Sequence, residues 1–533
     1  MITLGEIRVK AGQLEENFKA IEFVVNTSNH KTVLLPHLAL TGYHLGDLYK
    51  SSAFLDDVWS YHDKIAQLSQ GNTIIMGSLL QEEGKLYQAI LVFEDGMLLD
   101  NPVIKNDLNS YDVDYFHTKE SEQTITILNK VWKVSFDREI ADADTIVFGL
   151  DAYDKNHLEF YNAGIYINPM GLSNLKDNVY VYVGGSYQLN DILQSFDSVS
   201  DAMVTDIEER EEKILEAVKL GITWFDEEVL PFKPKWIVGV SGGLDSSLTV
   251  ALLATTLGSN RIIGVNMPSE YTRDITKSNA KHLSDALGYE SYIIPIKDMT
   301  QGTKDAFSYA GFDNLEGLTY ENVQARLRGH TLMTLSSLTN GVISNNGNKI
   351  ETALGYATLY GDAIGVLALL GDLNKLEVGA LAERLNKNQG KVIVPSNLIP
   401  KINDDQIEWD FAPSAELAQD QFDPMKWGYH DYLIEYLQGH DVESIMEAYL
   451  DGSILNLPMG PYLKAYGLDI GQAFMDDLEW VINTRNRAIY KRIQSPPILT
   501  LSKLGFPNES QGPVIKTSHY KTLKEEIIKR GRS

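Results

Sequence analysis

The sequence predicts an α/β protein of two domains, and three observations lead to this fold class. The chain has 533 residues, which is more than one ordinary hydrophobic core holds. Short apolar runs of strand composition alternate with segments of helical spacing over the first 200 residues. The same alternation starts again after residue 235. Strands and helices that alternate in this way are typical of layered α/β units.

In the N-terminal part, apolar runs bounded by turn residues predict strands, and apolar residues three and four apart predict helices. The predicted strands are Thr32–Pro36, Thr73–Gly77, Ala89–Phe93 and Thr145–Gly149, and the predicted helices are Leu14–Val25 and Val58–Leu68. A charged stretch from Asp206 to Lys213 opens an amphipathic helix toward Trp224, and its charges are most simply a solvated helix face. We place the domain junction near residue 200, which gives domains 1–200 and 201–533.

The second half repeats a strand–helix pattern. Predicted strands are Trp236–Val240, Arg261–Val265 and Ser291–Ile296, separated by predicted helices Ser246–Leu257 and Ile275–Leu287. Such a pattern indicates a doubly wound parallel sheet, covered by helices on both faces, with a ligand at the carboxyl ends of the strands. The tail after Lys503 is rich in turn residues and is expected to be partly mobile.

Composition excludes several classes of protein. The 44% hydrophobic and 22% charged residues are typical of a globular protein, and the net charge of -27 disfavours binding to nucleic acid or an anionic membrane. No apolar run reaches eighteen residues and the start lacks an export signal, so we expect a cytoplasmic protein. The chain contains no cysteine, which excludes disulfides, zinc–thiolate sites and every thiol nucleophile.

A glycine-rich loop, Ser241-Gly-Gly-Leu-Asp-Ser-Ser247, joins a predicted strand to a predicted helix. Its glycines let the backbone approach an anion, its serines offer hydroxyl donors, and the helix N-terminus is electropositive. Asp245 would repel a bare phosphate, which suggests a bridging Mg²⁺. A plain strand–helix connection is the alternative, but the full string in this context is far more specific.

The loop resembles the pyrophosphate-binding loop of the N-type ATP pyrophosphatases, which include NAD, GMP and asparagine synthetases and tRNA-modifying enzymes. The resemblance implies that ATP is cut between its α and β phosphates and that a carboxylate is activated as an adenylate. It also implies an adenine nucleotide α-hydrolase-like fold for this domain.

Further segments resemble the glutamine-dependent NAD synthetases in particular. They are Met267–Arg273, Glu321–Arg328, Gly347–Asp362, Asp372–Lys375, Pro413–Leu417 and Tyr490–Pro497, and they follow the family order. Before the family's GNK string, this chain has Asn346 in place of threonine, so we expect altered contact with ATP rather than lost activity. Arg326 and Arg328, two apart on a predicted helix, lie on different faces, so one of them could meet a phosphate while the other holds structure.

The resemblance implies roles for individual residues. The implied catalytic residues are Lys375, Asp245 and Glu351, and the last two are also the implied Mg²⁺ ligands. The implied ATP-binding residues are Gly239, Ser241, Gly242, Gly243, Asp245, Ser246, Ser247, Met267, Asn346, Lys375 and Ser414. The implied deamido-NAD-binding residues are Asn322, Arg326, Glu351, Tyr356, Ala357, Thr358, Leu359, Asp362 and Lys491.

The N-terminal domain resembles the nitrilase-like glutamine amidotransferase domain of these enzymes, most clearly at Leu35–Tyr43, which implies an αββα fold. The family uses a glutamate, a lysine and a cysteine nucleophile. Here His37 stands at the glutamate position, Lys105 is retained, and Asp137 aligns near the cysteine. Since no cysteine exists in the chain, a degenerate amidase is expected.

The expected activity is ATP-dependent amidation of deamido-NAD with ammonia, supplied free or by a separate glutaminase, in a homo-oligomer. Three alternatives stay open. Asp137 with His37 as base could form an atypical glutaminase, although an acyl-anhydride route for amide hydrolysis would be unusual. The chain could also be another adenylating amide ligase, or a silent assembly protein, and retention of Asp245, Glu351 and Lys375 argues against the last.

Overall fold

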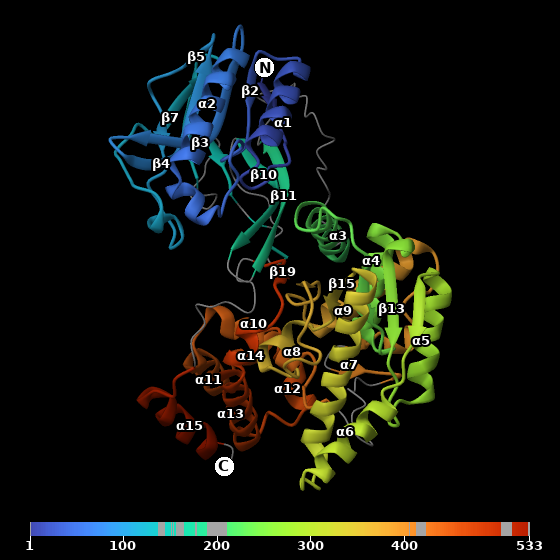
Figure 1. Ribbon diagram of the computed structural model, residues 1–533. Coiled ribbons are helices and arrows are strands. Elements are labelled where there is room, and N and C mark those ends of the chain that lie inside the picture. Colours follow the sequence, from blue (N-terminus) through green and yellow to red (C-terminus); the bar gives the residue numbers. More distant parts are fainter. Residues whose placement is uncertain are drawn as a thin grey trace. The chain divides into compact units, whose positions relative to one another are not determined.

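The computed structural model describes residues 2–136, 144–150, 152, 154–155, 165–175, 178–188, 210–403, 406–411, 423–502 and 514–530. The chain divides into two compact units, residues 1–175 with 179–210 and residues 176–178 with 211–533 (Figure 1). The domain junction expected near residue 200 lies outside the described residues. Among the described residues, no helix is long and apolar enough to cross a membrane.

The N-terminal unit contains two sheets. The first has strands β1 (Ile2–Leu4), β2 (Thr32–Leu34), β3 (Thr73–Glu82), β4 (Lys85–Glu94) and β5 (Met97–Leu98) in that order, and β6 (Val103–Ile104) also pairs with β4. The second has the order β11 (Asn178–Gln188), β10 (Ile165–Leu175), β9 (Thr145–Phe148), β8 (Lys130–Ser135) and β7 (Thr124–Ile127).

Apolar side chains of both sheets form one buried cluster, in which Leu34 and Ile75 of the first sheet join Trp132 and Phe148 of the second. The helices α1 (Leu14–Thr27) and α2 (Ser52–Leu68) bury their apolar sides in a separate cluster with the first sheet. Sheet therefore packs on sheet, with a helical layer outside, and the layered α/β class predicted from sequence is confirmed.

The C-terminal unit is built on a parallel sheet. Its strand order is β14 (Glu290–Ile293), β13 (Ile262–Asn266), β12 (Trp236–Gly239), β15 (Val342–Asn345), β16 (Leu367–Ala368) and β19 (Ile498–Thr500). The chain runs from β12 outward through β13 to β14, and then crosses back to β15 on the other side of β12. The strand order thus reverses between β12 and β15, and a ligand is expected beyond the carboxyl ends of these strands.

Among the described residues, the α-helices between β12 and η4 (Ser396–Leu398) accompany this sheet. They are α4 (Leu244–Leu257), α5 (Asp274–Leu287), α6 (Lys297–Tyr309), α7 (Gly317–Thr339), α8 (Lys349–Leu354) and α9 (Lys375–Gln389). Helix α4 contacts β12 and β13, whereas α7 contacts β12 and β15. The doubly wound parallel sheet predicted from sequence is confirmed, and its predicted strands and helices agree with the observed ones to within a few residues.

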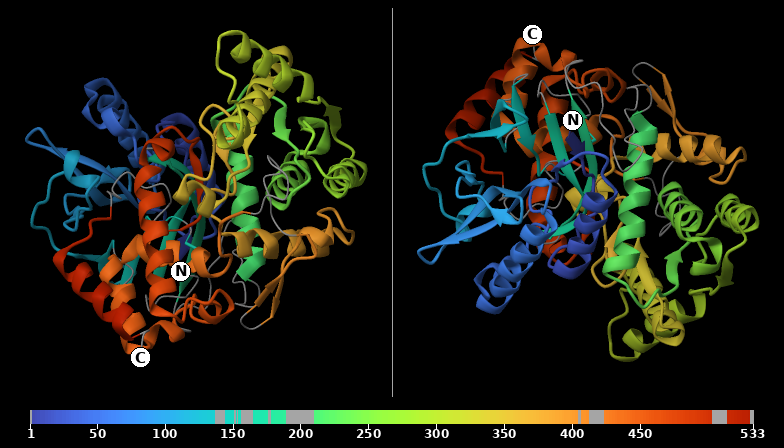
Figure 2. Two further views of the ribbon diagram at one scale, coloured as in Figure 1. Left: turned by 90° about the horizontal axis from the view of Figure 1, so that it is seen from below. Right: turned by 90° about the horizontal axis from the view of Figure 1, so that it is seen from above.

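The last part of the chain is helical. Helices α10 (Tyr429–Gly439), α11 (Val442–Asp451), α12 (Tyr462–Ala465), α13 (Gly471–Arg487), α14 (Ile489–Ile493) and α15 (Ser518–Arg530) gather on the side of the unit away from α5 and α6 (Figures 1 and 2). Helix α15 buries Tyr520, Leu523 and Ile527 and contacts α11 and α13. Within the turn-rich tail after Lys503, residues 518–530 thus form a helix that an apolar stripe anchors.

The buried carboxylate of Asp226, near the end of α3 (Arg210–Glu228), joins this helix to the sheet. It accepts hydrogen bonds from Trp236 Nε1 at 3.0 Å, Arg261 Nη2 at 2.7 Å and Lys233 Nζ at 3.1 Å. Replacing Asp226 with alanine leaves the first two donors without this acceptor. We expect urea unfolding to show a loss of about 3–5 kcal/mol. The control Lys233→Ala removes an exposed partner and should cost no more than about 1 kcal/mol.

Candidate active site

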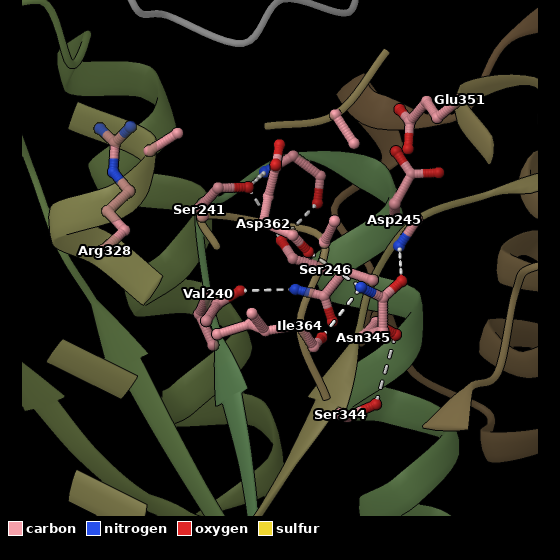
Figure 3. Close-up of a pocket in the computed structure, with 18 of the residues that line it drawn as sticks. Val240, Ser241, Asp245, Ser246, Arg328, Ser344, Asn345, Glu351, Asp362 and Ile364 are labelled. Atoms are coloured by element: carbon pink, nitrogen blue, oxygen red, sulfur yellow. Dashed lines mark hydrogen bonds between the residues drawn. The ribbon is translucent and has the colours of Figure 1, made fainter. Parts of the chain in front are cut away.

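A cavity of about 320 Å³ lies where the strand order reverses, lined from the carboxyl ends of β12, β13 and β15 (Figure 3). The sequence-predicted residues in its wall are Gly239, Ser241, Gly243, Asp245, Ser246, Met267, Asn346, Glu351, Tyr356, Ala357, Asp362, Lys375 and Lys491. These residues come from positions 239 to 491 of the chain. The fold thus brings most of the predicted site residues to one cavity.

The glycine-rich loop turns sharply between β12 and α4. Gly242 has φ +86°, and a Cβ there would lie 2.1 Å from the carbonyl oxygen of Thr276, so only glycine fits. Ser241 Oγ lies 3.0 Å from Ser246 Oγ and accepts a hydrogen bond from Gly243 N. Ser247 is fully buried and donates to the carbonyl of Gly243 at 2.7 Å, so it holds the helix start rather than facing the cavity.

Two carboxylates and a lysine face one another at one end of the cavity. Lys375, the first residue of α9, donates from Nζ to Asp245 Oδ2, and its side chain is only 3% exposed. Figure 3 shows the carboxyl groups of Asp245 and Glu351 pointing toward each other. Lys375 Nζ also lies 5.1 Å from the ring centre of Trp427. The cluster therefore places two carboxyl groups and one buried lysine beside the loop.

The electrostatics of this cluster follow from its burial. Burial and then the charge of Asp245 raise the pKa of Glu351 to about 8. Burial alone would lower the pKa of Lys375, but the charges of Asp245 and Glu351 outweigh it, and the pKa of Lys375 is raised. Lys375 therefore keeps its charge at neutral pH. The raised pKa of Glu351 reflects in part its repulsion from Asp245, which a second cation would relieve.

The donor set fits Mg²⁺. Carboxylate oxygens are its usual protein ligands, and it is commonly held by one or two of them together with water and substrate phosphates. Among the residues that the structure describes, no three His, Cys, Asp or Glu side chains come together as a complete metal cage. Asp245 and Glu351 would therefore hold the ion only in part, and oxygens of a bound nucleotide would complete its shell.

Asn345, Asn346 and Arg328 form another part of the wall. Asn345 Nδ2 donates to the carbonyls of Asp362 and Ile364 at 2.9 and 3.0 Å, and Asn346 Nδ2 donates to Gly239 O at 2.9 Å. Arg328 donates from Nε to Met267 O at 3.2 Å. Of the two arginines on α7, Arg328 lines the cavity, whereas Arg326 donates to Leu359 O at 3.4 Å outside it.

The remaining predicted substrate contacts are tied to one another beside the cavity. Thr358 Oγ1 donates to Asn322 Oδ1 at 2.8 Å, and Thr358 N donates to Asp362 Oδ1 at 2.6 Å. Lys491 donates to the carbonyls of Gly355 and Ala357 at 2.8 and 2.7 Å. The cavity wall does not include Gly242, Ser247, Asn322, Arg326, Thr358 or Leu359. Ser414 lies outside the described residues.

Sequence reasoning missed several residues of this wall. They include Trp409, Phe411 and Asp423, and the side chain of Asp423 interacts with that of the predicted Tyr356. The aromatic pair follows a strand, β18 (Gln406–Glu408), that no motif marked. Asn348, which caps α8 and is not part of the wall, was also missed. Its sequence pattern Asn-x-x-Glu is one that begins helices and could have identified it as a cap.

In the N-terminal unit, the residues at the expected amidase positions belong to a buried hydrogen-bond network. His37 Nε2 lies 2.9 Å from Gln88 Oε1, while Gln88 Nε2 donates to Asp112 Oδ1 at 2.8 Å. Lys105 donates to Asp112 Oδ2 at 2.8 Å, and Tyr43 donates to Asp112 Oδ1 at the same distance. Asp137 lies outside the described residues. The two described residues at the expected amidase positions, His37 and Lys105, therefore each have a hydrogen-bond partner within this unit.

His37 itself is fully buried and neutral. Burial and then the charge of Lys105 lower its pKa to about 3. Because the amide of Gln88 is oriented by Asp112, Nε2 of His37 is the donor to Gln88. Nδ1 packs on Gly77, where an added Cβ would lie only 2.1 Å away. The cavity next to His37 is about 20 Å³, room for roughly one water molecule.

The fold and the larger cavity together define a class. A parallel doubly wound sheet, a glycine-rich loop at its point of strand reversal, and an acidic pair with a buried lysine make the C-terminal unit a nucleotide-binding α/β domain.

Comparisons with known proteins show which nucleotide-binding proteins the chain resembles. Residues 227–453 match the family described as NAD synthase. The chain is similar to the glutamine-dependent NAD(+) synthetase of Thermotoga maritima, with 27% identity, over 83% of this chain and 90% of that protein. The residues that match this family all lie in the C-terminal unit.

Two solved structures share the whole fold. A glutamine-dependent NAD(+) synthetase from Cytophaga hutchinsonii superposes with a TM-score of 0.74 and 16% identity and covers 99% of both chains. The glutamine-dependent NAD+ synthetase of Acinetobacter baumannii, solved with ADP, has a TM-score of 0.65 and 20% identity over 96% of this chain and 98% of its own. At these identities the likeness concerns the fold, including its division into two units.

Proposed function

We propose that the chain converts deamido-NAD to NAD by ATP-dependent amidation and that it takes its nitrogen from ammonia. The observation that carries the first part is the cluster of Asp245, Glu351 and Lys375 beside the glycine-rich loop. The nicotinic acid carboxylate attacks the α-phosphate of ATP, pyrophosphate leaves, and ammonia displaces AMP from the acyl-adenylate.

The cluster supplies what this reaction needs. An attacking carboxylate and a triphosphate are both anions, so cations and N–H donors must offset their repulsion as charge moves to the leaving group. Lys375 provides a buried cation and the loop a set of backbone amides, while Mg²⁺ between Asp245 and Glu351 would neutralise phosphate oxygens.

The absence of cysteine from the sequence supports the second part of the proposal. His37 is an unsuitable base for another nucleophile such as Asp137, because its pKa is lowered to about 3 and its Nε2 is held by Gln88. Lys105 is paired with Asp112 rather than placed to stabilise an oxyanion. The relatives are named glutamine-dependent, so on this point the chain would differ from them.

The nitrogen donor tests the proposal directly. Purified full-length protein with ATP, Mg²⁺, deamido-NAD and ammonium should form NAD and AMP. Glutamine freed of ammonia should support less than about 1% of that rate, since the chain has no cysteine thiol to act as the nucleophile in amide hydrolysis. NAD formation and glutamate release are measured together by chromatography.

Glutamine-driven synthesis at a rate comparable to that with ammonium would contradict the loss of amidase activity. No NAD with either donor, while the protein remains folded and binds ATP, would contradict the synthetase assignment. Thermal-shift measurements with deamido-NAD, xanthosine monophosphate and aspartate separate this substrate from those of other adenylating ligases, because only a bound ligand stabilises the folded state.

A further inference from the structure

Asn348 lies directly between the two carboxylates of the acidic pair, and it is fully buried. Its side-chain Nδ2 donates to Asp245 Oδ1 at 3.0 Å, and its backbone N–H donates to Glu351 Oε2 at 3.2 Å. One residue thus holds one oxygen of each carboxylate.

The orientation of the Asn348 amide is fixed from the other side. Asn348 is the N-cap of α8, and its Oδ1 accepts from the backbone N–H groups of Ile350 and Glu351, both at 3.1 Å. With the oxygen committed to the helix, the NH₂ group must face Asp245. The reciprocal bond from Asn348 N to Glu351 completes a capping box, which in turn limits the rotamers of Glu351.

These bonds divide the oxygens of the pair. Asp245 presents Oδ1 to Asn348 and Oδ2 to Lys375, and Glu351 gives Oε2 to Asn348. Glu351 Oε1 and the second lone pairs of the bonded oxygens remain for a cation. Hydrogen bonds to ligating carboxylates set their direction, and their loss typically weakens metal binding about 10–100-fold.

We propose that Asn348 is a positioning residue that aligns Asp245 and Glu351 for a divalent cation, in addition to starting α8. This proposal depends on one part of the proposed function, namely that the chain binds ATP together with a divalent cation. Asn348 touches neither substrate nor phosphate in this assignment, and it acts through the two carboxylates.

The chain offers a matched control in Asn374, the N-cap of α9. Asn374 Oδ1 accepts from Glu377 N at 2.9 Å and Glu377 Oε2 accepts from Asn374 N at 3.1 Å, so the same capping box is present. Its Nδ2 donates to Glu435 at 3.3 Å rather than to the acidic pair. A serine at either position keeps a capping oxygen, whereas only Asn348→Ser removes the bond to Asp245.

The test measures Mn²⁺ binding by electron paramagnetic resonance in the presence of α,β-methylene-ATP, for the full-length parent, Asn348→Ser and Asn374→Ser. We expect about 10-fold or greater weakening of Mn²⁺ binding in Asn348→Ser and parental binding in Asn374→Ser. The Mg²⁺ concentration that half-saturates the rate should rise in parallel. Nucleotide binding without a divalent cation and the unfolding temperature should shift alike in both variants.

Parental Mn²⁺ affinity in Asn348→Ser, or equal weakening in both variants, would show that Asn348 serves only as a helix cap. The two proposals fail in different ways. If the parent binds Mn²⁺ with the nucleotide but forms no NAD, the function is wrong and the positioning role stands. If the parent forms NAD and Asn348→Ser keeps its cation dependence, only the positioning role is wrong.

Discussion

Replacing Asp245 with asparagine is expected to lower ammonium-dependent NAD formation at least about 1,000-fold. The change removes one of two carboxylates that would hold Mg²⁺ and also the charge that faces Lys375. Asparagine keeps the shape of the side chain and can still accept the hydrogen bond from Asn348, so the loop geometry should persist. The measurement is NAD formed at saturating ATP, deamido-NAD, ammonium and Mg²⁺.

Asp274→Asn is the control, since Asp274 is also an aspartate in the first turn of a helix but is fully exposed on α5. It should keep the parental rate. Circular dichroism and thermal unfolding show whether Asp245→Asn remains folded. A folded Asp245→Asn variant that retains one tenth of the parental rate would remove Asp245 from the reaction and leave the loop as a plain strand–helix connection.

Replacing Lys375 with methionine is expected to lower kcat about 100–1,000-fold. Methionine fills a similar volume but lacks the ammonium group that is paired with Asp245 and that, under the proposed function, would face the reacting phosphates. The buried acidic pair then loses its cation, so the pKa of Glu351 should rise further above about 8. Single-turnover formation of AMP reports this loss separately from product release.

The control for Lys375→Met is Lys281→Met on α5, where the lysine side chain is 75% exposed. This variant should be as active as the parent. If Lys375→Met is folded and forms AMP at the parental single-turnover rate but NAD slowly, then Lys375 acts on the ammonia step rather than on adenylate formation. That result would contradict the role given to it here.

Local sequence patterns were enough to predict the fold class, because the apolar periodicity of strands and helices reports burial directly. They were also enough to locate the loop at Ser241, since its glycine conformation and its helix start are local properties. Lys375 is different. It lies 130 residues from Asp245 in the chain, and only the resemblance to a family connected the two positions.

Two features of the structure could not be predicted from local sequence patterns. A helical pattern fixes which residues share a face but not which face meets a cavity, so the spacing of Arg326 and Arg328 could not show that Arg328 lines the wall. Helix α15 follows a turn-rich stretch and has few apolar residues, so only tertiary contact of Tyr520, Leu523 and Ile527 explains its order. Packing between distant segments decided both cases.

Under the proposal that amidase activity was lost from this chain, the network around His37 would make that loss difficult to reverse. A glutamate returned to position 37 would be buried beside Asp112 and would face the oxygen of Gln88, which is turned toward it by Asp112. A second buried carboxylate at this place would cost several kcal/mol. A cysteine introduced by one substitution would therefore lack its base, and the path back to glutamine hydrolysis passes through less stable intermediates.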